Sequence, residues 1–328
     1  MALLTTSYMG LTLRNPVVVS SCGLTGKIES IKKAAQAGAG AIVLKSLFEE
    51  QILNETHTVG KDYWESWHTE AYEYIGQMEK DFGIRNYLSL IEKVKSSITI
   101  PVIASINCVS TKMWAEFARQ IEAAGADGIE LNVAVMRPGE NTDPSQIEKT
   151  YFEIASEIKK HCKIPVAMKI GPYFTSLSKM THELSNRGID GLVLFNRFYQ
   201  FDLDIEKRSI FGAYQFSHPA EMAMPLRWTS LLAGQIDCDI AASTGIHDGK
   251  SVIKLIMAGA NVAQVCSILY TKGIDKVADI VNEIDSWCDN HGIKDINEIR
   301  GILSKKNSAY PEHYERYQYI KSLVDVDD

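Results

Sequence analysis

The chain has 328 residues, of which 45% are hydrophobic and 23% are charged, and its formal net charge at pH 7 is −7. The apolar fraction excludes a mainly disordered chain, and the acidic balance gives no support to a nucleic-acid or anionic-membrane surface. Six cysteines without a CxxC pair form neither a disulfide framework nor a metal pattern, so we expect reduced thiols, a cytoplasmic location and no metal. No signal peptide is apparent, and no apolar run approaches the ~18 residues of a membrane helix.

Four segments share a pattern in which a glycine separates a helix-like stretch from a short apolar run. They read AQAGAGAIVLKS, EAAGADGIELNV, SNRGIDGLVLFN and MAGANVAQVCS, and their glycines are Gly38, Gly125, Gly188 and Gly259. A glycine just past a helix adopts the left-handed conformation that ends it, and short continuous apolar runs are typical of parallel strands buried on both faces. The repetition predicts helix-to-strand units around a parallel sheet.

Counting these units along the chain gives eight strands. We expect them near Pro16–Ser20, Ala41–Lys45, Pro101–Ile106, Gly128–Val133, Pro165–Ile170, Gly191–Phe195, Asp239–Ser243 and Val262–Cys266. Helices are expected at Ile28–Ala37, Ile84–Ser96, Met113–Ala124, Gln146–His161, Leu177–Arg187, Lys250–Ala258 and Ile274–Asn290. This count predicts an α/β fold, a (β/α)8 TIM barrel. A doubly wound open sheet is the competing architecture, but no GxGxxG follows the first strand.

Two long connections follow the second and sixth predicted strands. They are Ser46–Gly83 and Asn196–Met224, and we expect both as insertions at the end of the barrel where active sites are built. The first is rich in aromatic residues, among them Trp64 and Trp67, which form either a small satellite core or a lid over a planar ligand. No linker interrupts the chain, so we expect a single domain over residues 1–328 with a polar tail from about residue 304.

Polar side chains gather at the predicted carboxyl ends of the strands. Lys45 and Lys169 end two of them, with no carboxylate expected at neighbouring strand ends, and Asn132 and Asn196 end two others. Polar groups in an apolar barrel are costly unless something satisfies them, so two converging lysines favour an electron-rich or anionic ligand over a simple ion pair. Glycine and serine after the seventh and eighth strands are typical of the phosphate site of this fold.

The order and spacing of several motifs resemble one family over nearly the whole chain. The chain is similar to the FMN-dependent dihydroorotate dehydrogenases of class 1 and to the related dihydropyrimidine dehydrogenases. The stretches that carry the resemblance are LTLRNPVVVSSCG, AGAGAIVLKS, PVIASI, GADGIELNV, IPVAMKIGPYF, GIDGLVLFNR, PAEMAMPLRW and STGI followed by HDG. The resemblance implies an FMN cofactor, a pyrimidine-like small-molecule substrate and a homodimer.

Four residues take catalytic positions by this resemblance. Lys45 lies near flavin and substrate, Asn132 hydrogen-bonds both flavin and a pyrimidine, Lys169 lies beside flavin N1 and O2, and Asn196 contacts the pyrimidine. A fixed positive charge at Lys169 would stabilise the anionic reduced flavin. All four also count among the implied cofactor contacts, together with Cys22 and Gly23 beside the ring, Ser46, and the phosphate-binding pairs Thr244-Gly245 and Cys266-Ser267.

The chain departs from the family pattern where the proton would be removed. The family has a cysteine after its fourth strand, and this position is Val135, which has no titratable group and cannot act as a general base. Cys108 and His218 are the alternative candidates for the base, although each is also explained as a packed or loop residue. Arg137 and Arg197 are additional cations, and they suggest a substrate with more negative charge than dihydroorotate.

Three flavin-based functions therefore remain open, against a fourth possibility, a phosphate-sugar lyase or isomerase barrel without flavin, which would need a carboxylate or Schiff-base arrangement at the strand ends. The first is an FMN-dependent oxidoreductase of the CH–CH class that converts dihydroorotate to orotate in pyrimidine biosynthesis. The second is an FMN oxidoreductase acting on another cyclic amide or an enone. The third is a relative that binds flavin without catalysis. The absence of a base at Val135 favours the second and third, whereas the four retained polar residues argue against decay of the site.

Overall fold

The computed structural model describes residues 2–49, 83–108, 114–135, 139, 143–197, 200–213 and 215–324. Three expectations from the sequence fall elsewhere. Most of the Ser46–Gly83 connection with its tryptophans, Arg137, and the Cys108 side chain lie outside the described residues. Within the described part, no helix is both long and apolar enough to span a bilayer.

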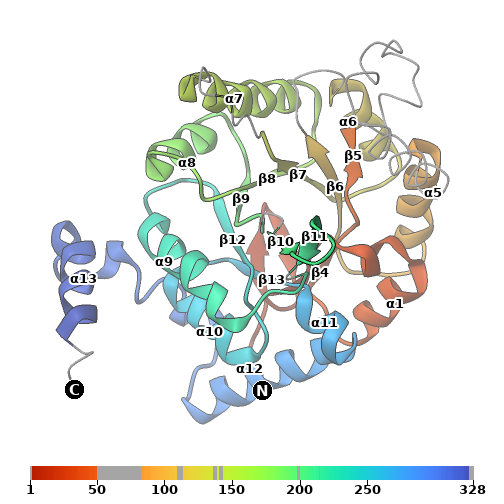
Figure 1. Ribbon diagram of the computed structural model, residues 1–328. Helices are drawn as coiled ribbons and strands as arrows, with labels where there is room; N and C mark the ends of the chain where they lie inside the picture. Colours follow the sequence, from red (N-terminus) through yellow and green to blue (C-terminus); the bar gives the residue numbers. More distant parts are fainter. Residues whose placement is uncertain are drawn as a thin grey trace.

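Eight parallel strands close into a barrel (Figure 1). The order runs from β4 through β3, β13, β12, β9, β8 and β7 to β6, and β6 pairs back with β4. The bounds are β3 (Val17–Val19), β4 (Ala41–Val43), β6 (Val102–Cys108), β7 (Gly128–Val133), β8 (Val166–Ile170), β9 (Gly191–Leu194), β12 (Asp239–Ser243) and β13 (Val262–Val265). A short strand, β5 (Leu47–Phe48), continues along β6. The predicted (β/α)8 TIM barrel is confirmed.

Helices surround the strands, as Figure 1 shows. Their bounds are α1 (Ile28–Gln36), α5 (Ile84–Lys95), α6 (Trp114–Ala123), α7 (Pro144–His161), α8 (Leu177–Asn186), α9 (Ala223–Leu232), α10 (Gly249–Ala258), α11 (Ser267–Lys272) and α12 (Lys276–Asn290). Gly38, Gly125, Gly188 and Gly259 follow α1, α6, α8 and α10, and all four have positive φ angles. The glycine pattern therefore marks helix ends as predicted.

An antiparallel hairpin closes the amino-terminal end of the barrel. It consists of β1 (Thr6–Tyr8) and β2 (Leu11–Leu13). Tyr8 and Met9 are buried together with residues of the barrel interior, and the Met9 N–H donates to the Asp239 carboxylate at 2.7 Å. With this end plugged, the opposite end, where the strands terminate, is left for a ligand, as is usual for this fold.

The connection after β9 contains a second hairpin, β10 (Gln200–Asp204) with β11 (Ser209–Ala213), most of which is exposed. It leads into the short helix η2 (Pro219–Met222) before α9. The carboxyl-terminal segment holds η3 (Ile296–Ile299), η4 (Lys305–Asn307), η5 (Pro311–His313) and α13 (Tyr314–Val324). Helix α13 projects away from the barrel in Figure 1 and has no buried residue.

Candidate active site

The barrel brings predicted residues from distant parts of the chain to one end. Asn132 and Lys169 are paired in the register of β7 and β8, and the Asn196 N–H donates to the Ile170 carbonyl at 2.8 Å. One cavity at this end is lined by six of the predicted residues, which are Lys169, Asn196, Thr244, Gly245, Cys266 and Ser267. Lys45 and Ser46 follow β4 on the same end of the barrel.

A buried polar network holds Lys169. Its Nζ lies 3.4 Å from the Ser20 hydroxyl and 3.9 Å from Glu130 Oε1. Gln264 links the other two residues, because its Oε1 accepts from Ser20 at 3.0 Å and its Nε2 donates to Glu130 at 2.6 Å. All four side chains are buried, so the lysine is held in one place by a network with three residues from three other strands or strand ends.

The position of Glu130 contradicts one expectation about the charges beside Lys169. The sequence predicts no carboxylate beside the lysines, but Glu130 is 1% exposed and lies within ion-pair distance of Lys169. Glu130 and Asn132 are two residues apart on β7, so both side chains point to the same face of the strand. The segment GIELNV was interpreted as a continuous apolar run, and the alternation that points Glu130 into the barrel was missed.

Asn132 presents a buried acceptor without a partner. Its Oδ1 is inaccessible to solvent and has no hydrogen-bond partner among the described residues. An unsatisfied buried acceptor costs about 1–3 kcal/mol, and a ligand that donates to the Asn132 oxygen would remove this cost. The adjacent position on β6 is Asn107, which is paired with Asn132 in the strand register.

Ser46 is held by a chain of hydroxyl groups. Its Oγ lies 3.0 Å from the Ser21 hydroxyl and 2.7 Å from the Ser105 hydroxyl. The backbone of Ser105 is anchored in turn by Tyr87 of α5, whose hydroxyl donates to the Ser105 carbonyl at 3.0 Å. These contacts connect the ends of β3, β4 and β6, and they fix the position of Ser46 beside Lys45.

Strained backbone and two further side chains complete the end of the cavity near β12 and β13. Thr244 and Gly245 both have positive φ angles, and a Cβ on Gly245 would lie 2.3 Å from the Met222 nitrogen, so only glycine fits there. The Ser217 hydroxyl accepts from the Gly245 N–H at 3.3 Å and donates to the Ser267 hydroxyl at 3.0 Å. His247 contacts Ser217 at 3.4 Å, and burial lowers the pKa of its imidazole.

Neither Ser217 nor His247 was predicted from the sequence. Ser217 belongs to the long connection after β9, and no local pattern indicates that it returns to the loops after β12 and β13. His247 lies within the STGIHDG segment, so its place near the expected phosphate site could have been recognised.

A family model described as dihydroorotate dehydrogenase matches residues 3–287. The chain belongs to the dihydroorotate dehydrogenase family. The catalytic subunit of dihydroorotate dehydrogenase B (NAD(+)) from Methanocaldococcus jannaschii is 28% identical over 316 residues, covering 92% of this chain and 98% of the relative. The subunits with the same name from Pyrococcus furiosus and Thermoplasma acidophilum are 25% and 26% identical, covering 90% and 92% of this chain and 97% and 99% of theirs.

Membership of the dihydroorotate dehydrogenase family makes the departures at Val135 and Arg197 informative. Val135 follows β7, its N–H donates to the Tyr151 hydroxyl at 3.3 Å, and its partly buried aliphatic side chain packs against the hydrophobic core. Arg197 forms an ion pair with Glu221 at 2.8 Å. Its charge is therefore balanced within the chain, and the expectation of an added cation for an anionic substrate is not supported at this position.

The two candidate bases are placed differently. His218 is exposed and begins η2, where its Nδ1 accepts the Ala220 N–H at 3.3 Å and its own N–H donates to Glu221. With Nδ1 used as an acceptor, the neutral ring carries its proton on Nε2 and offers a donor there. Cys108 is the last residue of β6, in register with Val133. The assignment of either residue as a base stays a prediction.

Proposed function

We propose that the protein is an FMN-dependent oxidoreductase that acts on a CH–CH bond of a pyrimidine-like cyclic amide. Membership of the dihydroorotate dehydrogenase family supports this chemistry. The observation that carries the proposal is the buried Asn132 Oδ1, which has no partner in the described part of the chain and belongs to a residue in register with the buried Lys169. Together they offer an acceptor and a positive charge to one planar ligand rich in N–H and C=O groups.

The residues present fit FMN. The unpartnered Asn132 oxygen suits an N–H of the flavin or of a pyrimidine, and Lys169 suits the electron-rich edge of the ring. At the other end of the cavity, the Gly245 N–H and the hydroxyls of Ser217 and Ser267 hydrogen-bond one another, and as a cluster of donors they would turn toward a bound phosphate. When bound, FMN would accept a hydride from the substrate.

The chain's own groups have separate tasks. Asn132 and Asn196 would orient the substrate, because amide side chains can both donate to and accept from a cyclic amide. Lys169 would hold positive charge beside the flavin, and its buried network fixes it in place. Lys45, with Ser46 fixed beside it, would lie near flavin and substrate.

Val135 favours a second candidate substrate. The oxidation of dihydroorotate releases a proton as well as a hydride, and the side chain of Val135 can accept no proton. A substrate of the same shape whose proton is lost to solvent, or which is reduced rather than oxidised, would not need a base at this position. A different cyclic amide or an enone is therefore the alternative for this site.

The absorption spectrum of the purified protein tests the proposal, followed by anaerobic addition of dihydroorotate. We expect a flavin band, and its bleaching by dihydroorotate identifies the first substrate. A flavin band that is unchanged by dihydroorotate but bleaches with another cyclic amide identifies the second candidate substrate. A protein that binds no flavin when FMN is added contradicts the proposal.

The substitution Asn132→Ala separates binding of flavin from turnover. We expect FMN to remain bound and kcat/KM for the identified substrate to fall about 10- to 100-fold, because a hydrogen bond from a buried group is lost. Asn290→Ala, at the exposed end of α12, is the matched control and should leave kcat/KM unchanged. Equal activity of the two variants would remove Asn132 from the site.

A further inference from the structure

Two cysteines far apart in the sequence meet beside the candidate active site. Cys22 follows β3 and Cys266 follows β13, and these strands are neighbours in the barrel, with Val19 paired to Val265. The Ser20 N–H donates to the Val265 carbonyl at 2.9 Å, so the two loops leave the barrel side by side. The thiols of Cys22 and Cys266 hydrogen-bond each other, and both side chains are half-buried.

The surroundings of Cys22 favour its thiolate. A hydrogen bond with Cys266 lowers the pKa of the Cys22 thiol to about 6, against the effect of burial, with further help from the N–H groups of Thr25 and Leu24. The Tyr270 hydroxyl also hydrogen-bonds Cys22, and it accepts the Leu24 N–H at 3.2 Å. A thiolate fraction at neutral pH makes a cysteine nucleophilic.

The other described cysteines lack these properties. Burial raises the pKa of the Cys162 thiol and of the Cys238 thiol to about 11. Cys288 is fully buried, and burial raises its pKa as well. The Cys266 thiol also has a raised pKa, because it donates to Cys22 and is buried. The pair thus combines one reactive thiolate with one neighbouring thiol, which is the arrangement of redox-sensitive cysteine pairs.

We propose that Cys22 and Cys266 are a redox-sensitive pair that a hydroperoxide converts to a disulfide at the wall of the cavity. In the first step the Cys22 thiolate attacks the peroxide, the O–O bond breaks, and sulfenic acid and an alcohol, or water from hydrogen peroxide, are formed after uptake of one proton. In the second step the Cys266 sulfur displaces water from the sulfenic acid and loses its proton. Together the two thiols lose two electrons to the hydroperoxide, and a dithiol reductant restores both thiols.

The pair is independent of the proposed flavin chemistry, since the oxidant is the peroxide and no step uses a cofactor. The cysteine pair nevertheless lies beside the candidate active site. Cys266 lines the same cavity as Lys169, and it directly precedes Ser267, whose hydroxyl accepts the Ser217 N–H at 2.9 Å. A disulfide would tie the loop after β3 to this donor cluster.

Peptide mapping of the purified full chain tests the proposal. The protein is treated with one equivalent of hydrogen peroxide at pH 7, alkylated and digested, and the peptides are identified by mass spectrometry. We expect one peptide pair joined through Cys22 and Cys266, the loss of two thiols per chain, and recovery of both thiols with dithiothreitol. Recovery of Cys22 and Cys266 as separate alkylated peptides, or a disulfide to any other cysteine, would overturn the proposal.

Three variants identify the roles of the two thiols. Cys22→Ser should slow peroxide-dependent thiol loss by about tenfold or more. Cys266→Ser should leave Cys22 as a sulfenic acid that dimedone traps. Cys238→Ser is the matched control and should form the disulfide as the unmodified chain does. If Cys22→Ser reacts at the rate of the control, the reactive thiolate is not Cys22 and the proposal fails.

Discussion

The buried Glu130 carboxylate lies opposite the Lys169 ammonium group inside the barrel. Lys169 is 7% exposed, and Glu130 lies 3.9 Å from its Nζ. Removing one partner of a buried ion pair leaves the other charge uncompensated, which typically costs 3–5 kcal/mol. We therefore expect Glu130→Ala to lower the free energy of unfolding by about 3 kcal/mol, measured by urea denaturation at pH 7.

Two further variants check that the cost comes from the pair. Glu130→Gln keeps an acceptor for Gln264 and should cost less than Glu130→Ala. The double variant Glu130→Ala with Lys169→Met removes the unpaired charge and should regain part of the loss, since contacting residues are not additive. Additive effects of the two substitutions would mean that Glu130 acts by packing alone.

The sequence could identify those site residues whose place at the site follows from their position along a strand alone. Lys169 and Asn196 lie at strand ends, and reading the end of each strand places them at the site. Glu130 was missed because its role depends on which face of β7 it occupies. The ion pair of Arg197 could not be predicted because its partner, Glu221, is 24 residues away across a hairpin. The pairing of Cys22 with Cys266 spans almost the whole chain and follows only from barrel closure.

The helix-ending glycines differ in how tightly they are packed. Gly125 has a φ of +94°, and a Cβ there would meet its nearest atom, Lys95 Cγ, at 3.9 Å. Gly259 has a φ of +118°, and its Cβ would lie 2.2 Å from Ala233 Cβ. We expect Gly125→Ala to lower the free energy of unfolding by about 1–2 kcal/mol, because alanine is disfavoured in the left-handed backbone conformation. Gly259→Ala should lower it by at least about 1 kcal/mol more, because the added methyl group overpacks the contact between α10 and α9.

Urea denaturation of the two alanine variants, side by side, measures this difference. Both positions end a helix before a strand, so the two variants lose a similar amount of unfolding free energy from the backbone. The additional loss in Gly259→Ala measures the contact with Ala233. Equal costs would show that Ala233 moves aside and that the ends of α9 and α10 are not rigidly packed.

The barrel strands and most of the helices around them could be predicted because helix ends and buried strands leave local signals, whereas α9 and α11 were not expected. The eight barrel strands are short apolar runs next to glycine or proline, and each was expected within a few residues of its bounds. The hairpins β1–β2 and β10–β11 were not predicted. Their strands are three to five residues long, and β10 and β11 are mostly exposed, so no hydrophobic pattern indicates them.

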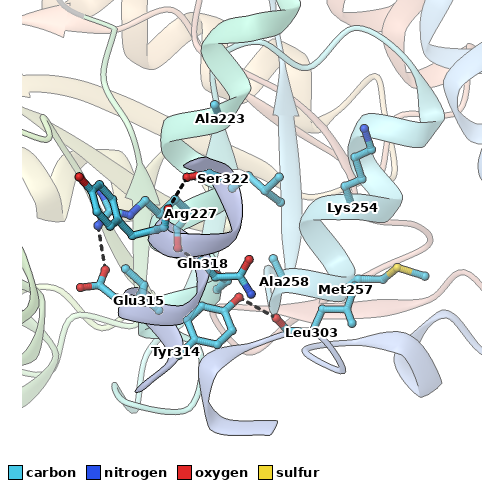
Figure 2. Close-up of a pocket in the computed structure, with 14 residues that line it drawn as sticks. Ala223, Arg227, Lys254, Met257, Ala258, Leu303, Tyr314, Glu315, Gln318 and Ser322 are labelled. Atoms are coloured by element: carbon cyan, nitrogen blue, oxygen red, sulfur yellow. Dashed lines mark hydrogen bonds and ion pairs between the residues drawn. The ribbon is translucent and has the colours of Figure 1, made fainter. Parts of the chain in front are cut away.

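The carboxyl-terminal helix stands apart from the rest of the molecule. A cavity of about 620 Å³ lies between α13 and the helices α9 and α10, and Figure 2 shows the residues that line it. Among the described residues, the helix is held there by the Arg227–Glu315 ion pair at 2.9 Å and by the Tyr314 hydroxyl, which donates to the Leu303 carbonyl at 3.3 Å. Tyr317, which is exposed, belongs to the apolar side chains that α13 leaves uncovered.

Removal of residues 309–328 tests what α13 contributes. None of its residues is buried, and an exposed ion pair contributes about 0–1 kcal/mol, so we expect the truncated chain to lose no more than about 1 kcal/mol of unfolding free energy. An isolated helix of 11 residues is marginal in water. A loss of several kcal/mol would therefore mean that α13 packs against another chain, as in the predicted homodimer. In that case the unfolding midpoint of the full chain would rise with protein concentration, and that of the truncated chain would not.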